Sequence, residues 1–143
     1  MTDQTNSTIQ YGKKAVMAAR QAILDEKPEL LRFFADFDSL KNNLSLEERK
    51  AYTHARIEAS VKSRVIFSSS SPEVESTPLP EDYIWVAKSN LPITNTIYIY
   101  NDTVILIDTR DANNMSVRTI KDSAYAENMK ILFEYIWQQN SLK

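Results

Sequence analysis

Apolar residues recur at helical spacing in the N-terminal part of the chain, between Tyr11 and about Glu26. One face of this predicted helix carries Tyr11, Ala15, Ala18, Ala19, Ala22 and Ile23. Pro28 ends the helix, because proline cannot continue its hydrogen bonding. The apolar run at residues 29–35 that follows is too short for a helix and is predicted to be a buried strand.

A second helix is predicted from about Leu46 to Val61. Its start matches a capping box, in which Ser45 and Glu48 each satisfy a backbone amide of the other. Residues 63–67 then have the composition of a second strand. A strand, a capped helix and another strand predict a right-handed crossover between parallel strands.

The second half of the chain changes to short alternating segments. Residues 83–87 and 115–120 are predicted strands, and residues 96–107 are predicted to form a hairpin around Asn101 and Asp102. A closing helix, with Asp122 as its N-cap, carries apolar residues at Met129, Leu132, Phe133, Ile136 and Trp137. We therefore expect an α/β fold, bordering on α+β, with helices packed on a mixed sheet, and we expect Phe133 and Trp137 to be buried.

The expected organisation is a flexible N-terminal tail at residues 1–9 and a single domain at residues 10–143. Residues 68–82 are rich in serine, proline, glutamate and threonine, and are predicted to be a mobile loop. The polar N-terminus lacks the features of a signal peptide, and no apolar run approaches the roughly 20 residues needed to span a bilayer. We expect a cytoplasmic protein without membrane contact.

The composition excludes several classes of site. A net charge of −2 and a pI near 5.5 argue against direct nucleic-acid binding, which usually requires a basic surface. The absence of cysteine excludes disulfides and thiolate metal sites. Gly12 is the only glycine, which excludes a P-loop and a dinucleotide-binding loop. No cofactor and no metal are expected.

Polar residues that follow the two predicted parallel strands mark a candidate pocket, because open α/β sheets bind ligands at the carboxyl ends of their strands. The candidate ligand-binding residues are Asp36, Asp38, Ser68, Ser69, Thr94, Thr96, Tyr98 and Tyr100. Alternatives remain open for each group: the aspartates are common turn formers or could bind Mg²⁺, the serines suit a linker, and the tyrosines suit packing beneath a helix as well as stacking on a sugar or base.

The segment from Thr94 to Gln139 resembles the C-terminal effector domain of TrmB-like, sugar-sensing transcription regulators. The resemblance rests on the hairpin TIYIYNDTVILID, the element Ile120-Lys121-Asp122, and Leu132-Phe133-Glu134 followed by Trp137. It implies a single phospholipase D-like lobe used for sensing, a sugar-like effector and homodimer formation. About ten residues precede the expected domain, so the winged helix that reads DNA in such regulators is expected to be absent.

The phospholipase D superfamily cleaves phosphodiesters with a His-x-Lys-x4-Asp motif, and this chain lacks it. His54 is the only histidine; two residues later stands Arg56, and seven residues later stands Val61. We therefore expect no catalytic residues and a non-enzymatic, ligand-sensing regulatory domain. Two alternatives are an interaction module for a separately encoded regulatory partner and a carboxylate- or metal-dependent hydrolase centred on Asp36 and Asp38.

Overall fold

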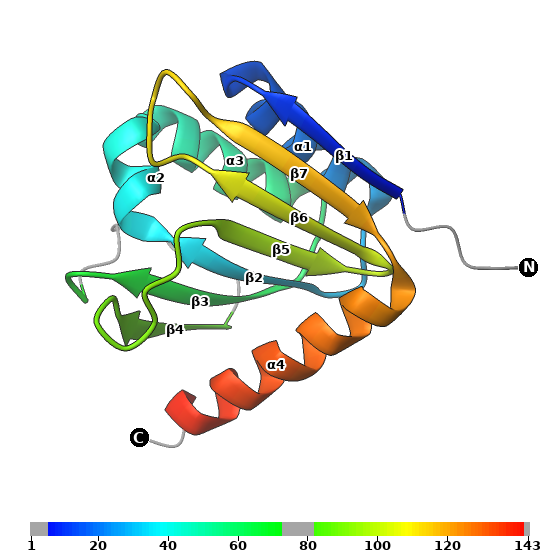
Figure 1. Ribbon diagram of the computed structural model, residues 1–143, viewed down its shortest axis with the longest axis vertical. Helices are drawn as coiled ribbons and strands as arrows, with labels where there is room; N and C mark the ends of the chain where they lie inside the picture. The colour runs from blue at the N-terminus through cyan, green and yellow to red at the C-terminus, as the bar shows by residue number, and fades with distance from the viewer. Residues whose placement is uncertain (1–5, 73–81, 142–143) are drawn as a thin grey trace, which may run out of the picture.

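A computed structural model describes residues 6–72 and 82–141 of the chain. The strands of the described residues form one mixed sheet in the order β1-β7-β6-β5-β2-β3-β4 (Figure 1). In chain order they are β1 (Asn6–Tyr11), β2 (Leu31–Asp36), β3 (Ser63–Ser69), β4 (Asp82–Ala87), β5 (Thr96–Tyr100), β6 (Thr103–Asp108) and β7 (Ser116–Lys121). Strands β2, β3 and β4 run parallel, and every other neighbouring pair is antiparallel.

Helices cover both faces of the sheet. The helices α1 (Lys13–Glu26), α2 (Phe37–Asn43) and α3 (Leu46–Glu58) lie on one face, and α4 (Ser123–Ser141) crosses the other (Figure 1). Two apolar cores result, one on each face: Phe33 and Tyr98 belong to the first, and Phe34 and Phe133 to the second. Within the described ranges, no helix combines the length and apolar character needed to cross a membrane.

The main elements predicted from the sequence are confirmed. β2 and β3 are parallel neighbours joined through α2 and α3, and β5 and β6 form the predicted hairpin. The capping box is present, with the Glu48 amide donating to Ser45 Oγ at 3.1 Å and the Ser45 amide donating to Glu48 Oε1 at 2.9 Å. Asp122 accepts from the amides of Ala124 and Tyr125 at the start of α4. Phe133 is fully buried, whereas Trp137 is only partly buried and stacks on Phe133.

Two elements differ from the sequence-based expectation. Residues 6–9, predicted to belong to a flexible tail, form most of β1, and Tyr11, predicted to lie on the first helix, is the last residue of this strand. The backbone of β1 pairs with β7 although its side chains remain exposed. The short helix α2 occupies the place where Asp36 and Asp38 were expected to form a turn, because the apolar side chains of Phe37 and Leu40 are buried there. In the predicted loop at residues 68–82, Ser68 and Ser69 belong to β3 and residue 82 begins β4, while residues 73–81 lie outside the described residues.

Candidate functional site

Polar side chains gather where β2 and β3 end and β5 begins, at the edge of the sheet that α2 adjoins (Figure 1). We call this place the carboxyl edge, and define it by Asp36, Asp38, Ser68, Ser69, Lys88, Thr96, Thr109 and Arg110. Five of the eight residues proposed from the sequence lie here, namely Asp36, Asp38, Ser68, Ser69 and Thr96. They come together because β2 and β3 are parallel and β5 runs antiparallel to β2, which places the start of β5 beside their ends.

An ion pair between a buried carboxylate and a partly exposed lysine lies at the carboxyl edge. The Asp36 carboxylate is only 3% exposed and lies 3.1 Å from the Nζ atom of Lys88. The Asp36 amide donates to Thr96 Oγ1 at 3.1 Å, and Lys88 Nζ also donates to the carbonyl of Ile93. Charges removed from water require such partners, so this pair fixes the segment after β4 against the end of β2.

The serines at the end of β3 hold the adjoining segments in place. Ser68 Oγ donates to the carbonyl of Leu91 at 2.6 Å, and Trp85 Nε1 donates to Ser69 Oγ at 3.0 Å. The Asp38 carboxylate accepts from the Ser70 amide at 3.1 Å. The two aspartates therefore have separate partners, and they do not share one ligand position.

The end of β6 adds a group whose hydroxyl has no hydrogen-bond partner. Thr109 is 1% exposed, and its Oγ1 atom is unpaired in the part of the chain that the structure describes. Its carbonyl accepts from Asn43 Nδ2 at 2.6 Å, which ties the end of α2 to this strand end. A buried hydroxyl without a partner costs free energy, so a group that paired with it would stabilise the native state.

Arg110 brings a positive charge to the rim of the carboxyl edge. Its guanidinium forms an ion pair of 2.7 Å with Asp108, and the hydrogen bond from Arg110 lowers the pKa of the Asp108 carboxyl despite partial burial. More than half of the Arg110 side chain remains exposed to solvent. The carboxyl edge therefore carries positively charged hydrogen-bond donors, on Lys88 and Arg110, and a negatively charged acceptor, on Asp36.

The remaining candidates do not join this group. Thr94 is exposed beside it, whereas Tyr98 and Tyr100 point into the core beneath α1 and α3. Tyr98 stacks on Phe33 at a ring-centroid distance of 4.8 Å. Burial and the neighbouring Glu26 carboxyl raise the pKa of Tyr100. Of the two alternatives left open for the tyrosines, packing beneath a helix is the one that the structure shows, because helices cover this side of the sheet.

Sequence reasoning missed Lys88, Thr109 and Arg110. Lys88 follows the predicted strand at residues 83–87, so the rule that selected Asp36 would also have selected it. Thr109 and Arg110 directly follow the second strand of the hairpin. No pattern in the sequence showed that the hairpin packs next to β2 through its first strand, β5. His54 is exposed on α3, as a helical surface histidine would be. Among the described residues, no three acidic or histidine side chains gather as a metal site would require.

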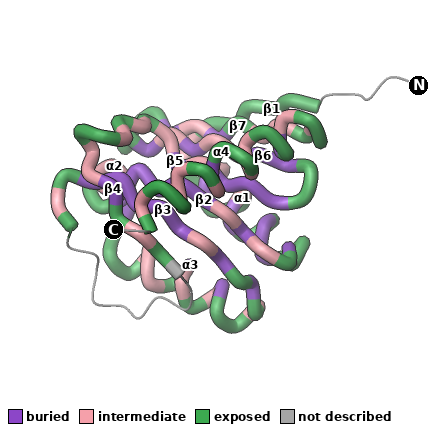
Figure 2. The backbone as a smooth tube through the Cα atoms, turned by 90° about the horizontal axis from the view of Figure 1, so that it is seen from below, coloured by how far each residue is buried: buried purple, intermediate pink, exposed green. Residues whose placement is uncertain are grey.

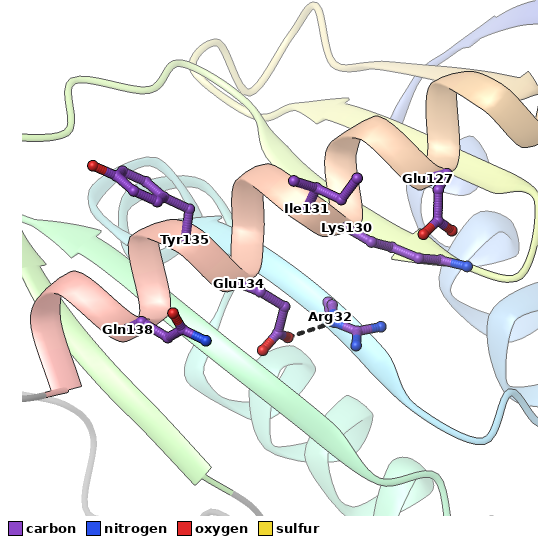
Figure 3. A pocket seen from close by; sticks show the side chains of 7 residues that line it. All are labelled: Arg32, Glu127, Lys130, Ile131, Glu134, Tyr135 and Gln138. Carbon is purple, nitrogen blue, oxygen red and sulfur yellow. Dashed lines mark hydrogen bonds and ion pairs between the residues drawn. The ribbon is translucent and has the colours of Figure 1, made fainter.

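A groove of about 400 Å³ lies on the other side of the sheet, along α4 (Figure 3). Glu134 crosses from α4 to the sheet, where its carboxylate lies 2.7 Å from Arg32 on β2 and 2.7 Å from Arg64 on β3. The exposed side chains of Ile131 and Tyr135 also line the groove, together with Glu127, Lys130 and Gln138. Because Glu134 already pairs with both arginines, the groove does not offer a free charge at its base.

The likeness of this chain to known proteins lies in its three-dimensional structure. No model of a known protein family matches the sequence, and no curated protein matches it by sequence. The structure is similar to NucT from Helicobacter pylori, with a TM-score of 0.69, 8% identity, and 94% of this chain and 97% of that chain covered. It is also similar to Nuc from Salmonella typhimurium, a phospholipase D family member, with a TM-score of 0.65, 12% identity, and 96% and 97% coverage.

A third similar structure is TrmBL2, described as an archaeal chromatin protein with a novel mode of DNA binding. The TM-score is 0.63 and the identity 15%; the alignment covers 94% of this chain but only 52% of TrmBL2, so the chain spans about half the length of that protein. The expectation of a phospholipase D-like fold is thus confirmed, and the resemblance to a TrmB-like protein is supported at the level of fold.

The expectation that this chain is not an enzyme is contradicted. The fold it shares with Nuc over nearly the whole of both chains is that of a phospholipase D family member. The absence of the His-x-Lys-x4-Asp motif excludes only the catalytic arrangement that uses this motif. The carboxyl edge still holds the buried carboxylate of Asp36 next to Lys88. The chain has the fold of a single phospholipase D-like lobe.

Proposed function

We propose that this chain is a regulatory domain that binds a small polar ligand, sugar-like in its hydroxyl groups, at the carboxyl edge. The observation that carries the proposal is that the carboxyl edge holds both the unpaired, buried hydroxyl of Thr109 and the ion pair of Asp36 and Lys88. A domain of this fold also forms about half of TrmBL2, described as an archaeal chromatin protein, and this likeness supports the regulatory part of the proposal.

The chemistry of the carboxyl edge suits a neutral, hydroxyl-rich ligand. A carboxylate accepts hydrogen bonds from sugar hydroxyls, an ammonium or guanidinium donates to them, and the threonine hydroxyl does either. The Asp36 carboxylate and the Lys88 ammonium already hold each other, and the Ile93 carbonyl holds the ammonium as well, so these two side chains would lose little entropy when a ligand binds.

Thr109→Val provides the sharpest test, because valine keeps the shape of threonine without the hydroxyl. In the absence of ligand, we expect this variant to be at least as stable as the wild type, since an unpaired buried hydroxyl is removed. A panel of sugars, sugar phosphates, nucleotides and divalent metals is screened by thermal shift, where a bound ligand raises the Tm by mass action. We expect a sugar-type ligand to raise the Tm of the wild type and not that of Thr109→Val.

The matched control is Thr103→Val, at the other end of β6, where the hydroxyl bonds to Asp102. This variant should keep the full ligand response, although its own stability falls because a hydrogen bond is lost. Absence of any sugar-type ligand in the panel, or an equal response in Thr109→Val, would contradict the proposal.

A second candidate, phosphodiester hydrolysis, is favoured by the likeness to Nuc. In this chain the group placed for such chemistry is the Asp36 carboxylate beside Lys88. Purified protein is assayed on a generic phosphodiester together with Asp36→Asn and His54→Ala. Hydrolysis that is lost in Asp36→Asn and kept in His54→Ala would establish the enzymatic function at the carboxyl edge, whereas a His54-dependent activity would contradict both candidates.

A further inference from the structure

Among the described residues, strand β1 ends the sheet, and no other strand pairs with its outer side. It pairs only with β7 in the sheet order, and all six of its residues, Asn6 to Tyr11, are exposed. Figure 2 shows this strand as exposed along its whole described length. An edge strand presents a row of unpaired backbone amides and carbonyls, which is a template for pairing with another chain.

The sequence of β1 lacks the devices that normally prevent such pairing. Proteins protect edge strands with charged residues, proline, bulges or a covering segment. The residues of β1 read NSTIQY, with no charge and no proline, and its register against β7 is continuous from end to end, without a bulge.

The pairing of β1 with β7 determines which backbone groups face outward. The Gly12 amide donates to the Met115 carbonyl at 2.9 Å, which is a hydrogen-bonded position continuing the register of the strand pair. Hydrogen-bonded and open positions alternate along an antiparallel ladder. The backbone groups of Ser7, Ile9 and Tyr11 therefore point away from the sheet.

We propose that β1 pairs antiparallel with β1 of a second copy of this chain and joins the two sheets about a twofold axis. When Ile9 lies opposite Ile9 of the second copy, Ser7 of each copy lies opposite Tyr11 of the other. All three outward-facing residues then form hydrogen-bonded pairs at once. A twofold pairing uses the same edge of both molecules, so the assembly closes as a dimer and does not extend into a fibre.

A second copy suits this edge by its side chains as well as by its backbone. Neither strand brings a charge into the ladder, so no like charges oppose each other. Ile9 and Tyr11 lie on one face of the strand, 41% and 67% exposed, and the proposed register makes them diagonal neighbours across the twofold axis. Aromatic and β-branched side chains in such positions stabilise sheets.

A rival surface is the exposed apolar face of α4, formed by Ile131, Leu132 and Tyr135. Nothing in the structure indicates what would cover that face, whereas β1 offers hydrogen bonds that match those of its own copy. The dimer through β1 goes beyond ligand binding and does not depend on it, because β1 and the carboxyl edge share no residue.

Mass measurement by light scattering at micromolar concentration tests the proposal with the full chain. We expect a dimer for the wild type and for Ile9→Val, and a monomer for Ile9→Pro, because proline removes an outward-facing amide while leaving the ladder to β7 intact. Circular dichroism checks that each variant is folded. A monomeric wild type, a dimeric and folded Ile9→Pro, or a dimer that is lost only in Ile131→Lys would overturn the proposal.

Crosslinking tests the register and does not require a disruptive substitution. The chain has no cysteine, so Ile9→Cys introduces a single thiol. Hydrogen-bonded residues of antiparallel strands lie about 5.5 Å apart between Cα atoms, within the range of a disulfide. We expect mild oxidation to convert most of this variant into a covalent dimer, and the exposed control Arg118→Cys to remain uncrosslinked. Equal crosslinking of the two variants would overturn the proposed pairing.

Discussion

Arg20 is a charged residue placed in an apolar setting between α1 and α3. It is 6% exposed, and its Cζ atom lies 3.9 Å from the ring centroid of Tyr52. Its Nε and Nη1 atoms have no hydrogen-bond partner among the described residues. The contact with the ring is favourable, but desolvation of a guanidinium with unused donors costs more than one such contact returns.

We therefore expect Arg20→Met to be neutral or to raise the free energy of unfolding, by up to about 4 kcal/mol, because methionine fills most of the volume without the charge. Arg20→Ala should instead destabilise, because truncation leaves a cavity. Urea titration of the three proteins measures both effects. A loss of more than about 2 kcal/mol in Arg20→Met would show that the charge itself stabilises the fold.

Individual residues also show where sequence reasoning about the site succeeded and where it failed. Asp36 was placed correctly, because a residue that follows a buried strand lies at a known edge of the sheet. Tyr98 was misplaced, because alternation along a strand assigns two faces without telling which face a helix covers. Thr109 could not be selected as a site residue from the sequence. Its position near the start of β5 depends on the register of the hairpin, and its lack of a hydrogen-bond partner depends on packing.

At the scale of elements, α4 is attached to the sheet mainly through Phe133. This side chain is fully buried and meets Phe34 of β2 edge-on at 5.0 Å. We expect Phe133→Ala to lower the free energy of unfolding by about 3–5 kcal/mol, the usual cost of a large cavity. The adjacent Leu132 is 53% exposed, so Leu132→Ala should change it by less than about 0.5 kcal/mol. Denaturant titration measures the free energy of unfolding of both variants. Similar losses in Phe133→Ala and Leu132→Ala would contradict the placement of α4.

The second attachment of α4 is electrostatic and depends on pH. Desolvation alone would raise the pKa of Glu134, but the hydrogen bond from Arg32 and the charges of Arg64 and Arg32 lower it. A carboxyl whose pKa is lower in the folded state stabilises the protein above its unfolded pKa of about 4.3, and this stabilisation is lost as the pH falls through the folded pKa.

We expect the wild type to have a higher Tm than Glu134→Gln at pH 7, and the difference to disappear under acidic conditions. Melting curves between neutral and acidic pH measure it in both proteins. Glu127→Gln serves as the control, because Glu127 is exposed on the same helix and forms no ion pair with a described residue. A wild-type advantage that persists unchanged at low pH would contradict the role of the ionised carboxylate.

Elements with a clear apolar period were predictable, and the two that lack one were not. α1, α3, α4 and most strands were predicted from their apolar pattern, although the residues that α1 buries are Val16, Arg20, Ile23 and Leu24, and of the predicted face only Ile23 is among them. β1 is polar and exposed, and its backbone pairing with β7 is fixed by hydrogen bonds that leave no mark in the pattern of side chains. α2 is short, so Phe37 and Leu40 give only one turn of periodicity between two aspartates.

At the scale of the whole molecule, the sheet separates the two proposed interactions. The carboxyl edge is built from β2, β3, β5 and the end of β6, whereas the proposed dimer uses β1, on the far side of β7 from them. Effects at sites without shared partners usually add, so ligand binding and dimer formation should be independent contributions to stability.

A native state that is also a dimer is stabilised by mass action, so its Tm rises with protein concentration. We expect this rise in the wild type and its absence in Ile9→Pro, while a sugar-type ligand raises the Tm of both by the same amount. In Thr109→Val the pattern should reverse, with the concentration dependence kept and the ligand response lost. Melting curves of the three proteins over a range of concentrations, with and without ligand, measure both quantities. A ligand response that disappears together with the dimer in Ile9→Pro would show that the ligand acts through the assembly and not through the carboxyl edge of one chain.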